Sequence, residues 1–547
     1  MKVSKANGVD NKKANGNILD RIHYVLLGVI FALAILLRIV GINWGLPNTN
    51  LHPDEGIIFN KAYECARDRS FEVEDYYYRP NHVLIKMNTL LYIGIQDLYF
   101  QPKGMDDFEL NFHEHISTFI VGSRIIVALF GIGIVVLSYF IACNWGKRQA
   151  LFVSMLFAVF PALIEHSHYI TPDVPLLFFL MCVIYVGIRY LKKPSAFKLF
   201  FMALFSAIAT CEKFTGIFGC VILAVTVCVT YYKKPLMILR EGVIAILMYV
   251  AGIMAVSPIL IVDYKDVVAA AAGQNGLYHL GGDGLNFGQT IWYYLKTTGE
   301  HVGLILTLGS IYGVIRSFKK DWKASAILIT FLVYLIPIST LHVHWERYTL
   351  PLYAVALFFG SFGLFYAFED IHKLLKKHKA AKLACVLIMF LLPMGSLMAG
   401  SMAMCGSFLA PDSRIFLQDV FEEMNINENN TCHDCNTPLD PGGYYGAFSN
   451  FENADPTKFK YGTVYYVMTS ASQRDEFFAG NQEYYGGVAN FYHKLDEEHE
   501  LVYLFTVENP SSHFIELQNI WYSARTVYRY MKGACKGFEI RLYRLIL

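Results

Sequence analysis

Charged residues are scarce in this chain of 547 residues. Asp, Glu, Lys and Arg together make up 17% of it and hydrophobic residues 55%, whereas charged residues form roughly a quarter of a soluble globular protein. The mean hydropathy is +0.37. Because apolar runs of about 17 to 23 residues recur along the chain, these features exclude an ordinary soluble protein and predict a polytopic α-helical membrane protein.

Several other signals are missing. The formal net charge is only +1, so no overall field favours nucleic acid as a partner. Residues 281–284 lack the strand, helix and lysine that accompany a phosphate-binding loop. The chain shows no two self-similar halves, which many transporters have. The apolar segment after residues 1–21 is too long for the core of a signal peptide, so we expect no cleavable one.

Cys432 and Cys435 form the only close cysteine pair. A zinc site needs a second pair of ligands at suitable spacing, and the sequence has none. A local disulfide on an oxidising face of the membrane is therefore favoured, with zinc as the alternative.

Eleven apolar segments are predicted to cross the membrane. They cover residues 22–42, 116–142, 149–163, 173–191, 197–211, 214–231, 241–262, 298–315, 325–341, 349–368 and 382–404. Lys and Arg concentrate in the tail 1–21 and in alternate short loops, at 147–148, 192–198, 233–240, 316–323 and 373–382. Because cytoplasmic loops carry the excess of Lys and Arg, we predict the N-terminus in the cytoplasm and the residues after 405 outside the plasma membrane.

The outer parts of the chain divide into a long loop and a terminal domain. The loop at 43–115 shows two amphipathic helical patterns, at residues 55–69 and 81–99. Residues 409–547 are more polar, with predicted helices at 413–425 and 490–499 and strands at 463–469, 501–507 and 538–543. We therefore predict a cytoplasmic tail (1–21), a membrane domain (22–404) and an extracytoplasmic α/β domain (409–547).

Ionisable side chains gather at the outer ends of the predicted spans. Asp54 and Glu55 follow the first span, and Lys86 lies on the second loop helix. Three short outer connections carry the others, which are His166, His168, Asp173, Lys213, Glu346 and Arg347. Such a convergence at one membrane depth indicates a functional site. Fixed cations suit an anionic phosphate leaving group, and a carboxylate suits the proton of an attacking acceptor.

Four stretches at these positions resemble a known family. They are Asp54-Glu55, residues 166–173, residues 212–216 and residues 346–351. In this order they resemble motifs of lipid-phosphosugar-dependent glycosyltransferases of the glycosyltransferase C superfamily, which includes protein O-mannosyltransferases and the aminoarabinose transferase of lipid A. The resemblance implies the membrane fold of that superfamily, a polyprenyl-phosphate sugar donor and Asp54 as catalytic base. It also implies a phosphate held by basic residues at positions like Lys86 and Arg347.

One departure from the family leaves the acceptor open. The outer segment 263–296 is too short for the trefoil domain that eukaryotic protein O-mannosyltransferases carry, and the tail is α/β as in bacterial members. The resemblance therefore leaves a protein, a lipid or a glycan polymer as the acceptor.

The resulting hypothesis is an inverting hexosyl or pentosyl transfer, with a role for each residue. Asp54 removes the proton of the acceptor, and Glu55 either shares this catalytic role or pairs with a cation and supports Asp54. Arg347, Lys213 and Lys86 bind the donor phosphate. The other predicted substrate contacts are His168, Asp173 and Glu346. A divalent metal is the one cofactor considered, with His166 and His168 as its candidate ligands.

Each assignment has a plainer alternative. Asp54 and Asp173 each stand at the start of a predicted helix and could simply cap it. Arg347 and Lys86 could instead contact lipid headgroups, and the histidines could be satisfied interfacial residues. For the whole protein, the alternatives are a transporter of lipid-linked sugars and a membrane-anchored glycan-binding protein.

Overall fold

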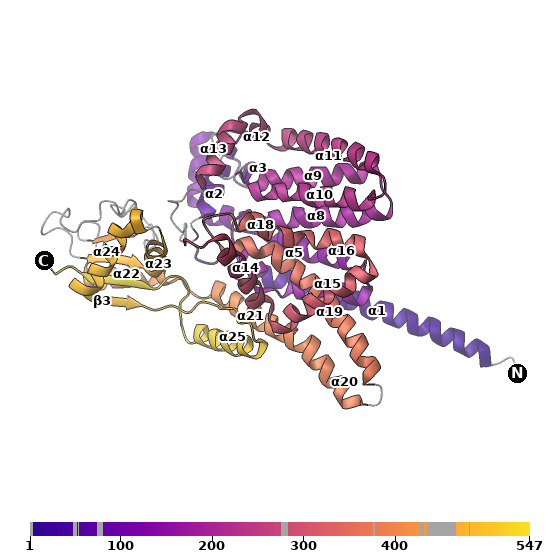
Figure 1. Ribbon diagram of the computed structural model, residues 1–547. Helices are drawn as coiled ribbons and strands as arrows, with labels where there is room; N and C mark the ends of the chain where they lie inside the picture. Colours follow the sequence, from indigo (N-terminus) through magenta and orange to yellow (C-terminus); the bar gives the residue numbers. More distant parts are fainter. Residues whose placement is uncertain are drawn as a thin grey trace.

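The computed structural model describes residues 4–47, 52, 54–73, 80–274, 283–375, 378–426, 431–434, 466–480 and 482–546. Helices form the larger body of the molecule, and a small sheet with its own helices stands at one end of that body (Figure 1).

The body is built from apolar helices of very different lengths. In chain order these are α1 (Ser4–Ile39), α5 (Ile116–Ala142), α6 (Lys147–Ala158), α7 (Pro161–His166), α8 (Asp173–Lys192), α9 (Ala196–Glu212), α10 (Phe218–Thr230), α11 (Pro235–Val256), α12 (Ile259–Val262), α14 (Phe287–Val302), α15 (Leu304–Lys320), α16 (Trp322–Leu328), α17 (Thr330–Val333), α18 (Leu335–Ile338), α19 (Leu350–Leu374), α20 (Lys379–Val386) and α21 (Leu392–Leu409). The short 3-10 helices η2 (Phe214–Ile217) and η3 (Glu346–Thr349) precede α10 and α19, and the π-helical turn η4 (Leu387–Leu391) joins α20 to α21.

The outer connections carry helices of their own. The first loop contains α2 (Glu55–Arg67), α3 (His82–Ile95), the π-helical turn η1 (Gln96–Phe100) and α4 (Met105–Glu114), and α13 (Tyr264–Gln274) follows α12. The helices α2 and α3 correspond to the two amphipathic patterns predicted in this loop, and they pack against each other. Their apolar faces are buried, as the amphipathic pattern requires.

Among the described residues, six helical stretches are long and apolar enough to cross a membrane. They are Arg21–Ile39, Ile116–Ala142, Asp173–Lys192, Pro235–Val256, Glu346–Leu374 and Lys379–Leu409. Together, α14 and α15 add a seventh if this pair, bent by 112°, counts as one span, and Phe214–Thr230 and Trp322–Ile338 are shorter apolar helices. These helices confirm a polytopic helical membrane protein, whereas the number eleven remains a prediction.

The predicted span 298–315 is wrong at its start. Gly303 has φ of 85° and ends α14, and α15 then leaves at a sharp angle. A positive φ is a conformation that glycine adopts without steric cost. Residues 298–302 therefore belong to the helix before the bend.

Close helix packing fixes the helix that follows η3. α15 and α19 cross with glycine against backbone, because a Cβ atom at Gly313 would lie 1.9 Å from the carbonyl oxygen of Phe359. A Cβ atom at Gly363 would likewise lie 1.8 Å from the carbonyl oxygen of Gly309. Small residues at such a crossing let membrane helices approach closely. The middle of α19, the helix that directly follows η3, is thus packed closely against α15.

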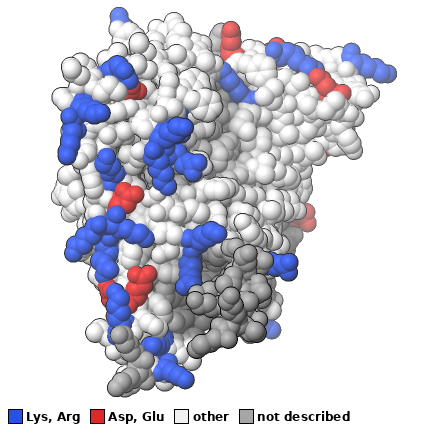
Figure 2. Space-filling model, turned by 90° about the vertical axis from the view of Figure 1, so that its right-hand side faces the viewer, with Lys and Arg blue, Asp and Glu red and all other residues white. Residues whose placement is uncertain are grey.

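The two ends of the helical body differ. The loop helix α2 and the C-terminal sheet lie toward one end, and the N-terminus projects beyond the other (Figure 1). Figure 2 faces the latter end and shows many more Lys and Arg than Asp and Glu side chains. Exposed basic residues lie in the turns after α5, α8, α10 and at the end of α15, namely Lys147, Arg148, Lys192, Lys193, Lys233, Lys234, Lys319 and Lys320. The basic loops predicted to share one side of the membrane therefore share one end of the molecule.

The C-terminal region contains strands as predicted. β1 (Thr431–His433), β2 (Tyr466–Ser470), β3 (Glu500–Phe505) and β4 (Ile540–Arg544) form a sheet in the order β1-β2-β4-β3, in which only β1 and β2 are parallel. Three helices accompany it, which are α22 (Ser413–Met424), α23 (Ala471–Ala479) and α24 (Gln482–Glu498). The side chain of Cys432 and all of Cys435 lie outside the described residues, so the disulfide stays a prediction.

A further helix, α25 (Glu516–Met531), was not predicted and ties this domain to the helical body. α25 packs on α21, where the Asn519 side chain donates from Nδ2 to the carbonyl oxygen of Ser396 at 3.1 Å. Just before α25, the carbonyl oxygen of Phe514 accepts from the backbone N–H of Leu304 at 2.8 Å. The C-terminal domain is therefore joined to the helical body at α21 and at the start of α15.

Candidate active site

Asp54 occupies the N-cap position of α2 but does not cap the helix with its side chain. Its carboxylate instead forms an ion pair with the guanidinium group of Arg347 from η3, nearly three hundred residues later in the chain. Both side chains are mostly buried, at 16% and 19% exposed. The capping alternative for Asp54 is therefore wrong.

Arg347 points into the protein rather than toward lipid headgroups. Besides Asp54 it faces the carboxylate of Asp173 at the start of α8. Its Nε is buried and has no hydrogen-bond partner among the described residues. A buried guanidinium with an unused donor is suited to bind a further anion.

A second ion pair lies beside the first. The Lys213 ammonium group, in the turn between α9 and η2, is 2.6 Å from the Asp173 carboxylate. The same ammonium group lies 4.4 Å from the ring centroid of Tyr348, the residue after Arg347. Asp173 is the first residue of α8. One of its carboxylate oxygens faces Lys213, and the other has no hydrogen-bond partner among the described residues. The structure thus brings together two carboxylates and two cations from four separate segments.

Glu55 sits next to Asp54 in sequence but serves a different set of contacts. Its two carboxylate oxygens accept from Arg124 on α5, from Nε at 2.9 Å and from Nη2 at 2.8 Å. One of them also accepts from the backbone N–H of Ile170 at 3.0 Å. Arg124 further donates to the carbonyl oxygens of Ile42 and Trp44. This buried pair joins the first outer loop to the connection before α8, which leaves the Glu55 carboxylate fully engaged in positioning.

Replacing Arg124 by Met should strongly destabilise the fold, because it leaves the Glu55 carboxylate buried and unpaired. We expect a loss of about 3–5 kcal/mol in the free energy of unfolding, measured by denaturant unfolding of the detergent-solubilised protein. The matched control is Arg69→Met, which breaks the exposed bidentate pair with Asp97 and should cost on the order of 1 kcal/mol or less. Equal losses in the two variants would contradict this role.

The histidines separate into two environments. His52 stacks on Tyr169 with ring centroids 4.3 Å apart, and its Nδ1 accepts from the backbone N–H of Asp54 at 3.3 Å. Burial lowers the pKa of His166 to about 4, although the Asp173 carboxylate opposes this shift. His166 is therefore neutral at pH 7 and lies next to the charged cluster. Burial also lowers the pKa of His52.

His168 is placed away from the charged cluster. Its ring stacks on Phe408 at 4.0 Å, and its two nitrogens lie 2.8 Å and 3.0 Å from the carbonyl oxygens of Ile164 and Val40. These contacts leave neither ring nitrogen for a substrate or a metal. His166 and His168 therefore do not form a ligand pair, and among the described residues no group of three or more His, Cys, Asp and Glu is arranged to hold a metal ion.

Two predicted site residues lie at the margin of the cluster. Lys86 is half-buried on α3 and donates from Nζ to the carbonyl oxygen of Val256, at the end of α11. Glu346 is 2.8 Å from Nε2 of His301 on α14, so it joins η3 to the helix before the bend. These contacts of Lys86 and Glu346 within the protein do not test whether either residue contacts a substrate, so both assignments stay predictions.

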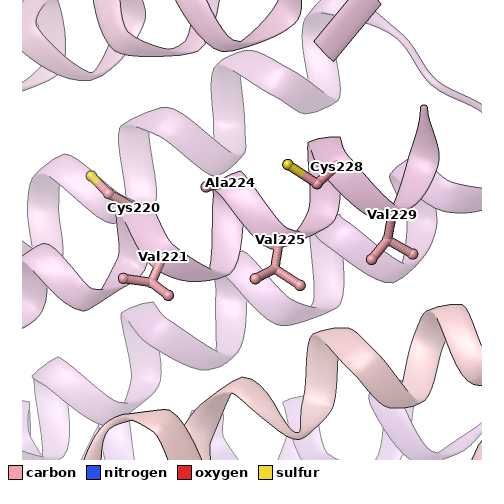
Figure 3. Close-up of a pocket in the computed structure, with 6 residues that line it drawn as sticks. All are labelled: Cys220, Val221, Ala224, Val225, Cys228 and Val229. Atoms are coloured by element: carbon pink, nitrogen blue, oxygen red, sulfur yellow. The ribbon is translucent and has the colours of Figure 1, made fainter. Parts of the chain in front are cut away.

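An apolar groove lies on the face of α10 (Figure 3). It has a volume of about 500 Å³ and is lined by Cys220, Val221, Ala224, Val225, Cys228 and Val229. Because no charged side chain lines it, the groove offers nothing to bind a phosphate.

Arg124 was missed by the sequence reasoning, although a signal was present. An Arg inside an apolar span is costly and marks a buried partner, and this one stands in the middle of the predicted span 116–142. Trp44 and Tyr169, which pack around the loop carrying Asp54, had no such signal. They are aromatic residues near a membrane surface, where aromatic residues are common.

Part of the chain matches a known family model. Residues 84–264 match the family model described as dolichyl-phosphate-mannose-protein mannosyltransferase. This segment includes Lys86, Asp173 and Lys213, and the match confirms the resemblance to lipid-phosphate-dependent glycosyltransferases. No curated protein matches the chain.

Several solved structures are distantly similar. The archaeal oligosaccharyltransferase AglB from Archaeoglobus fulgidus, in complex with an inhibitory peptide and a dolichol-phosphate, is 13% identical with a TM-score of 0.49, covering 88% of this chain and 73% of that chain. ArnT from Cupriavidus metallidurans bound to undecaprenyl phosphate is 15% identical with a TM-score of 0.43, covering 73% and 72%. The apo form of the Archaeoglobus enzyme is 11% identical with a TM-score of 0.49, covering 96% and 88%.

Proposed function

We propose that this chain, which carries a segment of the protein mannosyltransferase family, transfers a single hexose or pentose from a polyprenyl-phosphate to an acceptor outside the cytoplasm. The observation that carries the proposal is the cluster in which Asp54 pairs with Arg347 beside Asp173 and Lys213. All four residues stand at or next to helix ends. A transporter of lipid-linked sugars would commonly be built from internal repeats with its binding site at their interface, and the sequence shows no two self-similar halves.

The cations suit the leaving group. In the proposed reaction the bond between the anomeric carbon and the phosphate oxygen breaks, and negative charge grows on the departing phosphate. Arg347, whose Nε has no hydrogen-bond partner in the described part of the chain, and Lys213 are held in a largely buried cluster. Fixed positive charges in such a place stabilise developing negative charge more strongly than they would in water.

Asp54 is the proposed general base. The acceptor hydroxyl or amine attacks the anomeric carbon while its proton passes to the Asp54 carboxylate, so a single displacement inverts the anomeric configuration. A donor phosphate at Arg347 would share the guanidinium that now pairs with the Asp54 carboxylate. Glu55 is proposed to position Asp54, since both of its oxygens are already engaged.

The charge distribution supports the proposed orientation. The basic end of the body, seen in Figure 2, would face the cytoplasm with the N-terminus, following the positive-inside rule. The charged cluster and the C-terminal domain would then lie outside the plasma membrane, with eleven spans between. Lys86 would contact the donor headgroup or anionic lipid from α3.

Purified protein incubated with a panel of undecaprenyl- and dolichyl-phosphate hexoses and pentoses should release free polyprenyl phosphate with at least one donor. Mass spectrometry of the extracted lipids measures this release directly. The boiled protein supplies the background rate. If no donor in the panel is consumed, with or without added divalent metal and acceptor extract, the protein is not a transferase of this kind.

A further inference from the structure

Lys536 is a buried cation that the proposed reaction does not use. It belongs to the C-terminal domain, in the segment before β4, and only 7% of it is exposed. Its backbone N–H donates to the carbonyl oxygen of Pro411 at 3.0 Å, and its own carbonyl oxygen accepts from Ser413 at 2.8 Å. This short bridge holds Lys536 beside the linker that leaves the last helix of the body.

The Lys536 ammonium group reaches back into the helical body. It lies 3.8 Å from the ring centroid of Trp44, in the first outer loop, and 4.4 Å from that of Phe408 on α21. A cation is attracted to the face of an indole ring, and more strongly where water is excluded. The contact therefore joins the C-terminal domain to the beginning of the first outer loop.

Trp44 in turn is connected to the residues around Asp54. Its indole N–H donates to the carbonyl oxygen of His168 at 3.3 Å, and the Arg124 guanidinium lies 4.4 Å from its ring centroid. The ring also packs edge-on against Tyr169, which stacks on His52. The Trp44 ring therefore contacts Arg124, which binds Glu55. It also contacts Tyr169, which stacks on His52, two residues before Asp54.

Charges of both signs face Lys536 from the elements packed around it. Asp412 lies in the linker, Glu165 on α7, Arg124 on α5 and Arg414 at the start of α22. Burial lowers the pKa of Lys536 to about 7, against the attraction of the Asp412 and Glu165 carboxylates. The lysine is therefore protonated below about pH 7 and loses its charge above it.

We propose that Lys536 is a positioning residue for the transfer reaction. Its ammonium group fixes the Trp44 ring, and Trp44 with Arg124 and Tyr169 holds the loop in which Asp54 faces Arg347. The C-terminal domain is then part of the catalytic apparatus, although it supplies none of the reacting groups. This inference rests on the proposed function, because it assigns a role in that reaction.

The first test replaces Lys536 by Met in the full-length protein and measures turnover of the polyprenyl-phosphate sugar that the wild-type protein consumes. We expect kcat to fall by about 10- to 100-fold, since a displaced base costs rate. The KM for the donor should stay close to the wild-type value, because Arg347 and Lys213 are unchanged. Lys536→Arg, which keeps a cation, should recover most of the rate. Lys532→Met removes an exposed lysine four residues earlier and should behave like the wild type.

The second test is the pH profile, which does not depend on whether Lys536→Met folds. Wild-type kcat should decline as the pH rises through about 7 and Lys536 loses its proton. Lys536→Arg stays charged and should not show this decline. A decline that persists in Lys536→Arg belongs to another group, such as Glu165, and overturns the inference.

The outcomes separate the inference from the proposed function. Wild-type turnover with an equally active, folded Lys536→Met protein overturns only the role of Lys536. Absence of turnover by the wild-type protein with every donor overturns the proposed function and this inference with it. The fluorescence of Trp44 is obtained by subtracting the emission spectrum of the Trp44→Phe variant from that of the protein with Trp44 present. This Trp44 signal should change when Lys536 is replaced by Met. An unchanged Trp44 signal also counts against the contact.

Discussion

Replacing Asp54 by Asn should lower kcat by about 10²- to 10⁴-fold, the range that a positioned general base contributes. The substitution keeps the shape of the side chain and removes its capacity to take a proton. It also removes the charge that pairs with Arg347. The Arg347 guanidinium thereby loses an anion that competes with the donor phosphate, while Asp173 continues to face it. The donor should therefore bind at least as well as before. Release of polyprenyl phosphate, followed over time at saturating donor, gives kcat.

The matched control for this variant is Asp97→Asn. Asp97 also pairs with an arginine, Arg69, but at an exposed position on the first outer loop. Its loss should leave turnover unchanged. An Asp54→Asn protein that folds, binds donor and turns over at the wild-type rate would remove Asp54 from the role of base.

Replacing Arg347 by Gln should lower kcat by about 10²- to 10³-fold, as does loss of one fixed group that stabilises developing negative charge. Donor affinity should fall as well, because the guanidinium attracts the phosphate before and during the reaction. Arg347→Lys should recover only part of both losses, since an ammonium group is a point charge without the paired donors of a guanidinium. Donor titration of the initial rate separates KM from kcat.

Arg69→Gln serves as the control for Arg347→Gln, because it removes an arginine that also pairs with an aspartate, Asp97, but at an exposed position. Its KM and kcat should match those of the wild type. If Arg347→Gln weakens neither parameter, the phosphate is bound elsewhere and the assignment of this arginine is wrong.

Much of this site was predictable from charge alone. Asp54, Asp173, Lys213 and Arg347 stand out in the sequence because membrane spans contain few charges, and the alternation of basic loops places all four at one end. The structure shows that they form two neighbouring ion pairs. Scarcity of charge makes each remaining charge informative.

The roles within the site depended on tertiary contacts that no local pattern reveals. Asp54 and Glu55 are adjacent and chemically alike, yet Asp54 meets Arg347 and Glu55 meets Arg124. His166 and His168 are two residues apart, but only His166 lies near the cluster. Spacing in the sequence does not distinguish these pairs, because the partners come from distant helices.

The bend at Gly303 and the contact of Lys536 with Trp44 could not be predicted from neighbouring residues in the sequence either. The predicted span 298–315 runs across Gly303, where the helices on its two sides are bent by 112°. Lys536 lies in a segment that looks soluble, and its burial arises only because the C-terminal domain docks on the body. Long-range packing decides both features.

The central claim is that Asp54 takes the proton while Arg347 holds the phosphate, and one comparison tests it most directly. Donor affinity and the single-turnover rate are measured side by side for Asp54→Asn and Arg347→Gln with the donor that the wild-type protein consumes. Asp54→Asn should retain donor affinity and lose the rate, whereas Arg347→Gln should lose both. An Asp54→Asn protein with a wild-type single-turnover rate, or an Arg347→Gln protein with unchanged affinity and rate, would contradict the account.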